Sequence, residues 1–358
     1  MQNGKDAARD ATAASPWQVP DLTPDRLLQL GMGFWAAKTL LSAVELGVFT
    51  QLAKAPQDAA ALSAVLGLHP RGAVDFLDAL VALHALERED GKPGNLYRNT
   101  PDAELFLDKA KPTYVGGLLE MANARLYPSW ASLTDSLRSG RPQSEAAEEG
   151  DLFAAIYRDE QALRGFLQAM TGVSLAAAQA MARKFPWAEC QTFIDIGAAQ
   201  GALPVQIALA HPHLRGGGFD LPAVGPVFQE YVAAHGLQDR LGFYPGDFFT
   251  DPCPHADVLI MGHILHDWDI DQKLYLLEKC YSALPAGGRL IVYDAMIDDA
   301  RRQNAFGLLM SLNMLIETPG GFDYTGAQCC AWARQVGFAQ ARVEPLSGPD
   351  SMMIATRQ

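Results

Sequence analysis

The feature that most constrains the fold of this chain is a glycine turn that directly follows a buried strand. The segment Asp195-Ile-Gly-Ala-Ala-Gln-Gly201 continues the apolar run Thr192-Phe-Ile194, and the next apolar run ends on Asp220. This pairing of a glycine turn and a strand-end carboxylate is how α/β folds hold a nucleoside. Glycine lets the backbone approach the ligand closely, and the carboxylate binds ribose hydroxyls. The sequence therefore predicts a nucleoside site at one edge of a parallel sheet.

Around this turn, short apolar runs alternate with helical stretches, which is the pattern of a parallel sheet with crossover helices. The last two of seven predicted strands are adjacent, which fits a Rossmann-like, doubly wound sheet that ends in a hairpin. Helices are predicted to begin near Gly201, Val224, Asp271, Asn304 and Thr325. The predicted strands are Thr192–Ile196, Gly217–Asp220, Leu241–Pro245, Ala256–Met261, Arg289–Asp294, Ala341–Pro345 and Ser351–Thr356.

The N-terminal half has helical periodicity and the outline of a winged helix. A first helix is predicted to start within Val44–Leu52, and two more over Ala59–Leu66 and Arg71–Leu83, before a hairpin over Glu87–Thr100. A DNA-binding winged helix needs basic side chains on its third helix, but Arg71 is there outnumbered by Asp75 and Asp78. We therefore expect packing or dimerisation rather than DNA binding.

These patterns divide the chain into four parts. Residues 1–20 are expected to be a disordered tail, and residues 21–110 a winged-helix-like dimerisation domain. Residues 111–185 are expected to form a helical linker and substrate-pocket region, and residues 186–358 the nucleoside-binding catalytic domain. Ser139–Gly150 reads as an exposed connection.

Charge and cysteine usage exclude several kinds of partner. The net charge of −13 argues against nucleic acids and anionic membranes, both of which need concentrated Lys and Arg. No apolar run approaches the roughly 18 residues needed to span a bilayer, and the first twenty residues lack a signal-peptide core. Five cysteines without a C-x-x-C pair are expected to be reduced and mostly buried. A cytoplasmic protein is expected.

The glycine turn indicates a cofactor other than a dinucleotide. A dinucleotide fingerprint has a glycine where this chain has Ala199, because a pyrophosphate needs room there. Asp195, before the glycines, repels phosphate but suits a cationic ligand or an ammonium group. Both properties fit S-adenosylmethionine, with S-adenosylhomocysteine as product. The predicted cofactor-binding residues of this region are Asp195, Gly197, Gly201, Asp220, Leu221, Asp247 and Phe248.

The segment after the fourth predicted strand carries the residues best suited to catalysis. His263, His266, Asp267 and Trp268 follow that strand at the carboxyl edge of the sheet, and a histidine there can remove a proton from a hydroxyl near neutral pH. His263 and His266 also have the spacing of metal ligands, but no histidine follows His266, and no metal is predicted.

Two carboxylates are candidates to orient the imidazole. A carboxylate on Nδ1–H fixes the tautomer that leaves Nε2 free as the base. Asp294 ends the fifth predicted strand, Asp323 follows a Gly-Gly turn, and Glu317 is a reserve candidate. The sequence leaves open which of the three contacts the histidine.

At this point the chain resembles a known family, the class I S-adenosylmethionine-dependent O-methyltransferases of the plant caffeic-acid and animal acetylserotonin type, with bacterial members that act on natural products. The resemblance covers nearly the whole chain. Its pieces are Asp195–Gly201, Asp220, Gly246–Phe249, His266-Asp-Trp268, Leu284-Pro-Ala-Gly-Gly288 and Pro319-Gly-Gly-Phe-Asp323.

The resemblance implies that His266 is the general base and that Asp294 and Asp323, which stand where the family often has glutamates, flank it. It implies that Trp268 packs on the adenine edge. His263 stands where plant members have a lysine, and it is assigned to the cofactor site.

The resemblance also implies a homodimer through the N-terminal helices, in which one protomer's N-terminal segment closes its partner's pocket. The segment Gly31–Lys38, with Trp35, is the candidate, although its aromatic residues fit a plain core equally well. Apolar positions at helical spacing predict a pocket for a flat aromatic or hydrophobic acceptor. The predicted lining comprises Met121, Tyr127, Phe153, Tyr157, Phe166, Met170, Met310, Asn313 and Met314.

The function predicted from these residues is methyl transfer from S-adenosylmethionine to a phenol or enol hydroxyl of a small aromatic acceptor. Three alternatives remain open. They are C- or N-methylation on the same scaffold, with or without iron, a different reaction on a scaffold that binds this cofactor, and a regulator that binds DNA through its winged helix.

Overall fold

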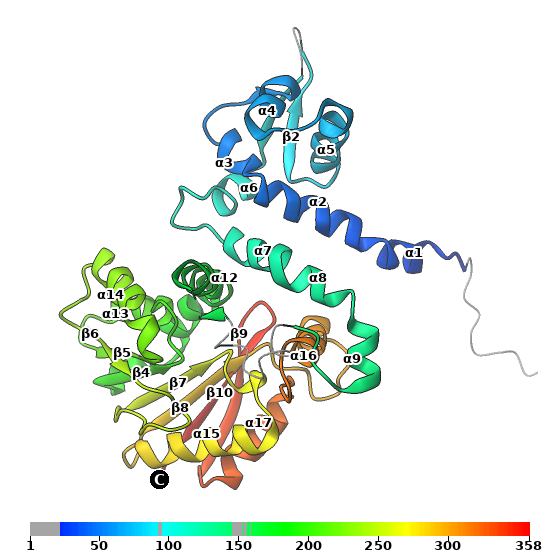
Figure 1. The fold of residues 1–358 in the computed structure, drawn as a ribbon. Coiled ribbons are helices and arrows are strands. Elements are labelled where there is room, and N and C mark those ends of the chain that lie inside the picture. The colour runs from blue at the N-terminus through cyan, green and yellow to red at the C-terminus, as the bar shows by residue number, and fades with distance from the viewer. Residues whose placement is uncertain (1–21, 92–94, 145–152, 154–155, 158) are drawn as a thin grey trace, which may run out of the picture.

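Two bodies of different construction lie one above the other in the computed structural model of the chain, which describes residues 22–91, 95–144, 153, 156–157 and 159–358. The N-terminal part is a small helical body with a narrow sheet, and the C-terminal part is a broad sheet covered by helices (Figure 1). The predicted tail over residues 1–20 and the second half of the predicted connection, residues 145–150, lie outside the described residues.

The N-terminal body has the winged-helix outline that the sequence predicts. Its antiparallel strands β1 (Gln57–Asp58), β2 (Leu86–Glu89) and β3 (Leu96–Asn99) pair in the order β1-β3-β2. Asp58 accepts a hydrogen bond from the Ala61 backbone at the start of α4, and Pro70 begins α5, so local capping explains both boundaries. The helices are α1 (Asp25–Gly31), α2 (Gly33–Glu45), α3 (Val48–Leu52), α4 (Ala59–Leu66), α5 (Pro70–Ala82) and α6 (Pro101–Phe106).

Two expectations for this body are wrong in detail. The segment Val44–Leu52, expected to start one helix, contains the end of α2 and the whole of α3, because Gly47 adopts a left-handed φ of 73° between them. The expectation that no apolar run approaches membrane-spanning length fails for Asp25–Glu45, 21 residues that are long and apolar enough to cross a bilayer by length and composition. The stretch is interrupted at Met32, and it is mostly exposed in the protomer.

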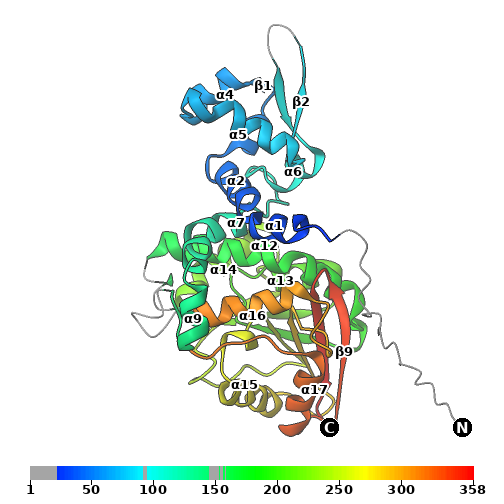
Figure 2. The ribbon, with the colours of Figure 1, turned by 90° about the vertical axis from the view of Figure 1, so that its right-hand side faces the viewer.

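A set of helices connects this body to the large sheet and covers one side of it (Figure 2). The long helix α12 (Glu160–Lys184) begins with Asp159, whose side chain accepts from the Ala162 backbone. A π-helical turn, η1, separates α7 from α8, and such turns are frequent at functional sites. The other elements are α7 (Gly116–Met121), η1 (Ala122–Leu126), α8 (Tyr127–Trp130) and α9 (Leu133–Ser139).

The large sheet has seven strands in the order β6-β5-β4-β7-β8-β10-β9. The first five strands in chain order run parallel, and β10 pairs antiparallel with both β8 and β9, so the predicted Rossmann-like sheet with a C-terminal hairpin is confirmed. The strands are β4 (Thr192–Ile196), β5 (Arg215–Asp220), β6 (Leu241–Pro245), β7 (Val258–Gly262), β8 (Arg289–Asp294), β9 (Gln340–Ser347) and β10 (Asp350–Thr356).

Strand β5 begins two residues earlier than its apolar pattern suggests. Its start reads Arg215-Gly-Gly-Gly218, and a Cβ on Gly217 would lie 1.9 Å from the carbonyl oxygen of Gly242. Glycine is therefore required by the close approach of β6, although it weakens the strand signal in the sequence.

Helices pack on both faces of this sheet, over two separate apolar cores. Alternate residues of each strand face opposite sides, so Ile194 and Leu259 pack in one core while Phe193 and Ile260 pack in the other. These elements are η2 (Trp187–Glu189), α13 (Ala202–Ala210), η3 (Pro222–Val224), α14 (Gly225–Ala234), η4 (Leu265–Asp267), α15 (Ile270–Ala283), α16 (Ala305–Glu317) and α17 (Gly326–Gln335). All five cysteines are free and buried, as expected.

Candidate active site

A cavity of about 320 Å³ opens at the carboxyl ends of β4, β5 and β7, between the sheet and the helices α7, α12 and α16. Open α/β sheets bind ligands at this edge. Most of the predicted site residues line it. They are Asp195, Gly197, Asp220, Leu221, Asp247, Phe248, His263, His266, Trp268, Met121, Tyr157, Phe166, Met170, Met310, Asn313 and Met314.

Five predicted site residues, Tyr127 among them, do not line this cavity in their own protomer. Gly201, Asp294 and Asp323 lie behind the wall residues, where they shape or orient them. Trp35 is 63% exposed on α2. A role for Trp35 in acceptor binding therefore requires the pocket of a partner protomer.

The glycine turn between β4 and α13 lines the inner end of the cavity, next to the ends of β4 and β5. Gly197 and Gly201 adopt left-handed φ angles of 72° and 92°, and a Cβ on Gly197 would lie 2.3 Å from Ile264 Cδ1. Ala199 adopts a φ of 49°, which is costly for a residue with a side chain. Local geometry thus requires glycine at the two positions that the sequence analysis selected.

Asp220 holds the turn to the neighbouring strand. Its two carboxylate oxygens accept hydrogen bonds from the backbone N–H groups of Ala199 at 2.9 Å and of Leu221 at 2.7 Å. These bonds fix the carboxylate at the cavity wall, and its remaining lone pairs can accept ribose hydroxyls.

The inner end of the cavity has unbalanced negative charge. Burial raises the pKa of Asp195 well above its usual range, and the nearby Asp220 adds to this shift. Burial also raises the pKa of Asp220 to about 6, against the two backbone donors. Among the described residues, none donates a hydrogen bond to the Asp195 side chain. A cationic ligand would restore the charge balance, so this wall fits the ammonium and sulfonium groups of S-adenosylmethionine.

An aromatic cluster forms the opposite side of the cofactor region. The ring of Trp268 packs edge-on against Phe249, with centroids 4.6 Å apart, and lies near Phe248 and Phe153. Its buried Nε1 has no hydrogen-bond partner within the described part of the chain. An apolar slot with one free N–H donor suits a flat, nitrogen-rich ring such as adenine. Phe249 also lines the cavity, although nothing in the sequence distinguishes it from the rest of the Gly246–Phe249 segment.

His266 lies at the cavity wall among three carboxylates. Its Nδ1 is 3.3 Å from Asp323 Oδ1 and 3.7 Å from Asp294 Oδ1, and its Nε2 is 3.5 Å from Asp267 Oδ1. The sequence leaves open which of three carboxylates contacts His266, and the structure shows that Asp323 makes this hydrogen bond. Glu317 pairs instead with Arg125 at 3.0 Å. Asp267 is the carboxylate that the sequence analysis did not choose, although its place beside His266 in the chain is a usable signal.

These carboxylates control the protonation of the imidazole. Burial alone lowers the pKa of His266, but the negative charges of Asp267, Asp294 and Asp323 outweigh it and raise the pKa to about 10. Burial raises the pKa of Asp294 to about 7, although the adjacent His266 charge opposes this. The Tyr324 hydroxyl donates a hydrogen bond to the second oxygen of Asp294 and fixes its orientation.

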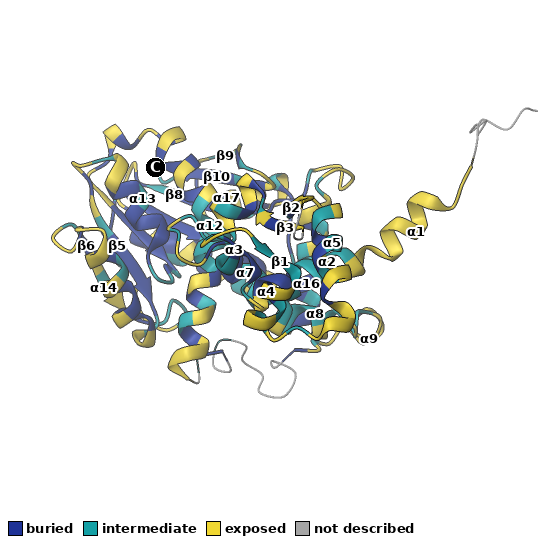
Figure 3. Ribbon diagram, turned by 90° about the horizontal axis from the view of Figure 1, so that it is seen from above, coloured by how far each residue is buried: buried dark blue, intermediate teal, exposed yellow. Residues whose placement is uncertain are grey.

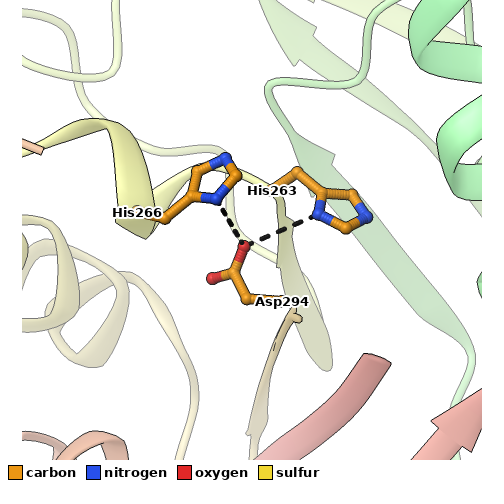
Figure 4. Close-up of side chains that lie close together, drawn as sticks. All are labelled: His263, His266 and Asp294. Carbon is orange, nitrogen blue, oxygen red and sulfur yellow. Dashed lines mark ion pairs between the residues drawn. The ribbon is translucent and has the colours of Figure 1, made fainter. Parts of the chain in front are cut away.

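His263 faces the same carboxylate from the other side (Figure 4). Its Nδ1 is 3.7 Å from Asp294 Oδ1, and its Nε2 is 3.9 Å from Asp350 Oδ2. Burial lowers the pKa of His263 to about 3, so this imidazole is neutral. Its backbone has a left-handed φ of 53°, and its N–H donates to the Tyr293 carbonyl at 3.0 Å.

The outer part of the cavity is apolar with a few polar groups. Met310, Asn313 and Met314 reach it from α16, and Asn313 accepts a hydrogen bond from Trp130 Nε1 at 2.8 Å. Leu118, Arg125 and Leu126 line it as well, and sequence reasoning missed them because their helical spacing does not distinguish a cavity wall from a packed core. Phe153 lines the cavity as predicted, whereas Tyr127 does not.

Comparison with known proteins covers almost the whole chain. A model of the O-methyltransferase domain matches residues 130–339, and a model of the O-methyltransferase dimerisation domain matches residues 28–109. The tetracenomycin polyketide synthesis 8-O-methyl transferase TcmO of Streptomyces glaucescens is 46% identical over 334 residues, 93% of this chain and 97% of its own length. The N,N-dimethyltransferase OxyT of Streptomyces rimosus is 42% identical over 276 residues, 76% of this chain and 79% of its own length.

A solved structure shares the fold and the cofactor. Human N-acetylserotonin methyltransferase, crystallised with S-adenosylmethionine, superposes with a TM-score of 0.89 at 29% identity, covering 95% of this chain and 99% of that one. The resemblance and the cofactor class predicted from sequence are thereby confirmed. The chain belongs to the S-adenosylmethionine-dependent O-methyltransferases and carries the dimerisation domain of that family.

Proposed function

We propose that His266 is the general base of this methyltransferase and that its acceptor is a phenolic hydroxyl on a flat, polycyclic aromatic molecule. The observation that carries the proposal is the carboxylate triad around a buried histidine at the cavity wall. Asp323, bonded to Nδ1, holds the ring in the orientation that leaves Nε2 as the proton acceptor.

The pKa of His266 matches the proposed acceptor. A free phenol has a pKa of about 10, and the surrounding carboxylates raise the pKa of His266 to about 10 as well. Proton transfer from phenol to neutral imidazole is therefore nearly balanced in free energy, and the negative charges of Asp294 and Asp323 stabilise the imidazolium that forms.

The remaining residues position the reactants. When bound, S-adenosylmethionine supplies a methyl group on a positively charged sulfur. Asp195 and Asp220 would hold its charged and ribose groups, and Trp268 would cover its base. With the acceptor in the outer cavity, its hydroxyl would lie between His266 and the inner end of the cavity, and this positioning converts an encounter into an intramolecular reaction.

The nature of the cavity wall supports an aromatic acceptor. Phe166, Met170, Met310 and Met314 present apolar, adaptable side chains. The relative TcmO is named as an 8-O-methyl transferase of tetracenomycin polyketide synthesis. We infer an acceptor of similar kind here, a polycyclic natural-product phenol.

Methylation of nitrogen is the second candidate, because the relative OxyT is named as an N,N-dimethyltransferase. A neutral amine already carries a free lone pair, so it needs a general base less than a phenol does. Acceptors that carry a phenol and a primary amine on the same aromatic frame separate the two reactions. We expect a single methyl ether, located by mass spectrometry and NMR, and methylation at nitrogen alone would reject the proposal.

The exposed apolar face of the first two helices supports a homodimer. Leu27, Leu28, Leu30, Phe34 and Trp35 are each about half exposed or more on α1 and the start of α2, and α1 projects from the body (Figure 3). Contiguous apolar surface of this kind marks an interaction site, and it lies within the match to the dimerisation domain. We propose that this face pairs with a second copy and that Trp35 closes the partner's cavity.

The wing supports packing rather than DNA binding. Asp78, on the helix that would enter DNA, pairs with Arg88 of the wing at 2.7 Å and accepts from the Tyr97 hydroxyl at 2.8 Å. The charge of Asp78 is therefore paired within the body. We also propose the division of the chain at residues 110 and 185, and a cytoplasmic location, which suits five free thiols.

A further inference from the structure

Two histidines of the cavity wall meet a carboxylate that lies behind it (Figure 4). The Nδ1 atoms of His263 and His266 each lie 3.7 Å from Asp294 Oδ1, and the three atoms lie within 4.8 Å of one another. Two imidazole nitrogens and one carboxylate oxygen are a common ligand set for zinc and related divalent ions.

The second nitrogen of each imidazole, Nε2, also faces a carboxylate, as in metal sites. Histidines that bind metals usually direct their second nitrogen to a carboxylate, which sets the tautomer. Here His266 Nε2 lies 3.5 Å from Asp267 Oδ1, and His263 Nε2 lies 3.9 Å from Asp350 Oδ2. Both rings therefore turn Nδ1 towards Asp294 and Nε2 towards an outer carboxylate.

Two atoms of this group are buried without a hydrogen-bond partner in the described residues. These are Asp294 Oδ1, which both rings face, and His263 Nε2. Asp294 is 1% exposed, and burying an unsatisfied carboxylate oxygen is costly unless a ligand compensates it. His263 is also held in a left-handed backbone conformation, and such strain is found where a side chain must be placed for function.

We propose that His263, His266 and Asp294 form a zinc site and that zinc bound there inhibits the enzyme. Tetrahedral zinc about 2.0–2.1 Å from each donor separates the donor atoms by roughly 3.3 Å. The two 3.7 Å separations from Asp294 Oδ1 therefore need to close only slightly, and the two Nδ1 atoms, which lie within 4.8 Å of each other, must approach as the rings turn. A water molecule or Asp323, whose second oxygen is buried, can complete the coordination.

Inhibition follows from the tautomer of the bound histidine. A neutral imidazole that binds metal through Nδ1 carries its proton on Nε2, and it then cannot accept a proton there. Inhibition by zinc requires that His266 Nε2 is the general base, as proposed above. Zinc binding to the three residues does not depend on that role. The reaction itself is proposed to need no metal, so a chelator restores activity rather than removing it.

Binding is tested on chelator-treated, dialysed enzyme by titrating Zn²⁺ in competition with a chromophoric chelator. We expect one zinc per chain in the wild type. The informative variant is His263→Asn, because asparagine tolerates the left-handed backbone and so preserves the fold. Its zinc affinity should fall by more than the roughly 10- to 100-fold that loss of an outer-shell partner costs.

The matched control is His235→Asn, a substitution of an exposed histidine at the end of α14, which should keep wild-type zinc affinity. Substituting Co²⁺ for Zn²⁺ gives a visible spectrum that identifies the ligands. Tetrahedral nitrogen and oxygen bands are expected. A thiolate charge-transfer band, unchanged affinity in His263→Asn, or no binding to the wild type would each overturn the site.

Inhibition is tested separately, by initial rates in buffered free Zn²⁺. We expect activity to fall over the same concentration range in which zinc binds, and to recover fully with EDTA. Zinc that binds with the expected spectrum but leaves turnover unchanged would overturn the inhibitory role and would also count against His266 as the base. Loss of zinc binding alone would leave the proposed methyl-transfer mechanism intact.

Discussion

At the scale of single residues, the pH dependence of catalysis reports the environment of His266. The base must be neutral to accept a proton, and its raised pKa of about 10 means that raising the pH increases the neutral fraction. We expect kcat/KM to rise with pH through the alkaline range towards that value. Initial rates at fixed ionic strength measure this profile.

Removing one of the surrounding charges should move the profile. Asp323→Asn removes one of the negative charges that raise the pKa of His266 and weakens the hydrogen bond to Nδ1, so the alkaline limb should shift to lower pH while kcat falls. The control Asp271→Asn changes an exposed carboxylate on α15 and should leave the profile in place. An identical limb in Asp323→Asn and the wild type would rule out this electrostatic account.

Ala199 carries backbone strain that glycine would relieve. Its φ of 49° costs an alanine about 1–2 kcal/mol, while glycine loses roughly 0.5–1 kcal/mol through its freedom in the unfolded chain. Ala199→Gly should therefore increase the free energy of unfolding by about 0.5–1 kcal/mol. Denaturant melts measure it, with Ala208→Gly inside α13 as a control that should destabilise. A destabilising Ala199→Gly would contradict the strain argument.

At the scale of elements, the β4–α13 turn is shaped for the cofactor. Gly197→Ala introduces a Cβ that would lie 2.3 Å from Ile264 Cδ1 at a left-handed φ of 72°, so the strained turn and the Ile264 side chain at the cavity wall must both adjust. We expect the affinity for S-adenosylhomocysteine, measured by calorimetry, to fall by roughly 10-fold or more, the equivalent of 1.4 kcal/mol.

Gly140→Ala supplies the matched control for this turn. Gly140 ends α9 at a φ of 66° with nothing within 4 Å of an added Cβ, so the substitution carries similar backbone strain far from the turn. It should lower stability but leave the cofactor affinity unchanged. Equal losses of affinity in both variants would show that global destabilisation, rather than the turn, is responsible.

The elements of the large sheet could be predicted because their signals are local. Alternating apolar runs, the glycine turn and the capping residues each act within a few neighbours, so all seven strands were found. The exceptions have local causes too. Gly216 to Gly218 hide the start of β5, and Gly47 splits a helix that the apolar pattern presents as continuous.

The details of the site could not be predicted, because they depend on packing between distant segments. Asp323 and His266 are 57 positions apart, and only the approach of the loop after α16 to the end of β7 decides that Asp323, rather than Glu317, forms the hydrogen bond. The cavity wall has the same limit, since Arg125 and Leu126 share their helical spacing with core residues.

At the scale of the whole molecule, the apolar face of α1 and α2 predicts the oligomeric state. Replacing Leu28 and Trp35, which are 59% and 63% exposed, with glutamate puts charge into the proposed interface without disturbing the protomer core. The double variant should be a monomer by light scattering, whereas the wild type should be a dimer. Leu209→Glu, at a residue 51% exposed on α13, should remain dimeric. A dimeric double variant would place the interface elsewhere.

Together the two bodies assign different tasks to the two ends of the chain. The N-terminal helices offer an apolar surface for a second copy of the chain. The carboxyl edge of the large sheet, with the buried His266 cluster, forms one wall of the cavity. The account as a whole depends on the imidazole of that cluster, since every other group in the cavity is assigned to binding or orientation.

The most direct measurement is therefore made on His266→Ala, with turnover and the dissociation constant of S-adenosylhomocysteine determined on the same preparation. We expect turnover to fall by roughly 100-fold or more, with cofactor affinity close to that of the wild type. A variant that binds the cofactor normally and turns over at the wild-type rate would contradict the central claim.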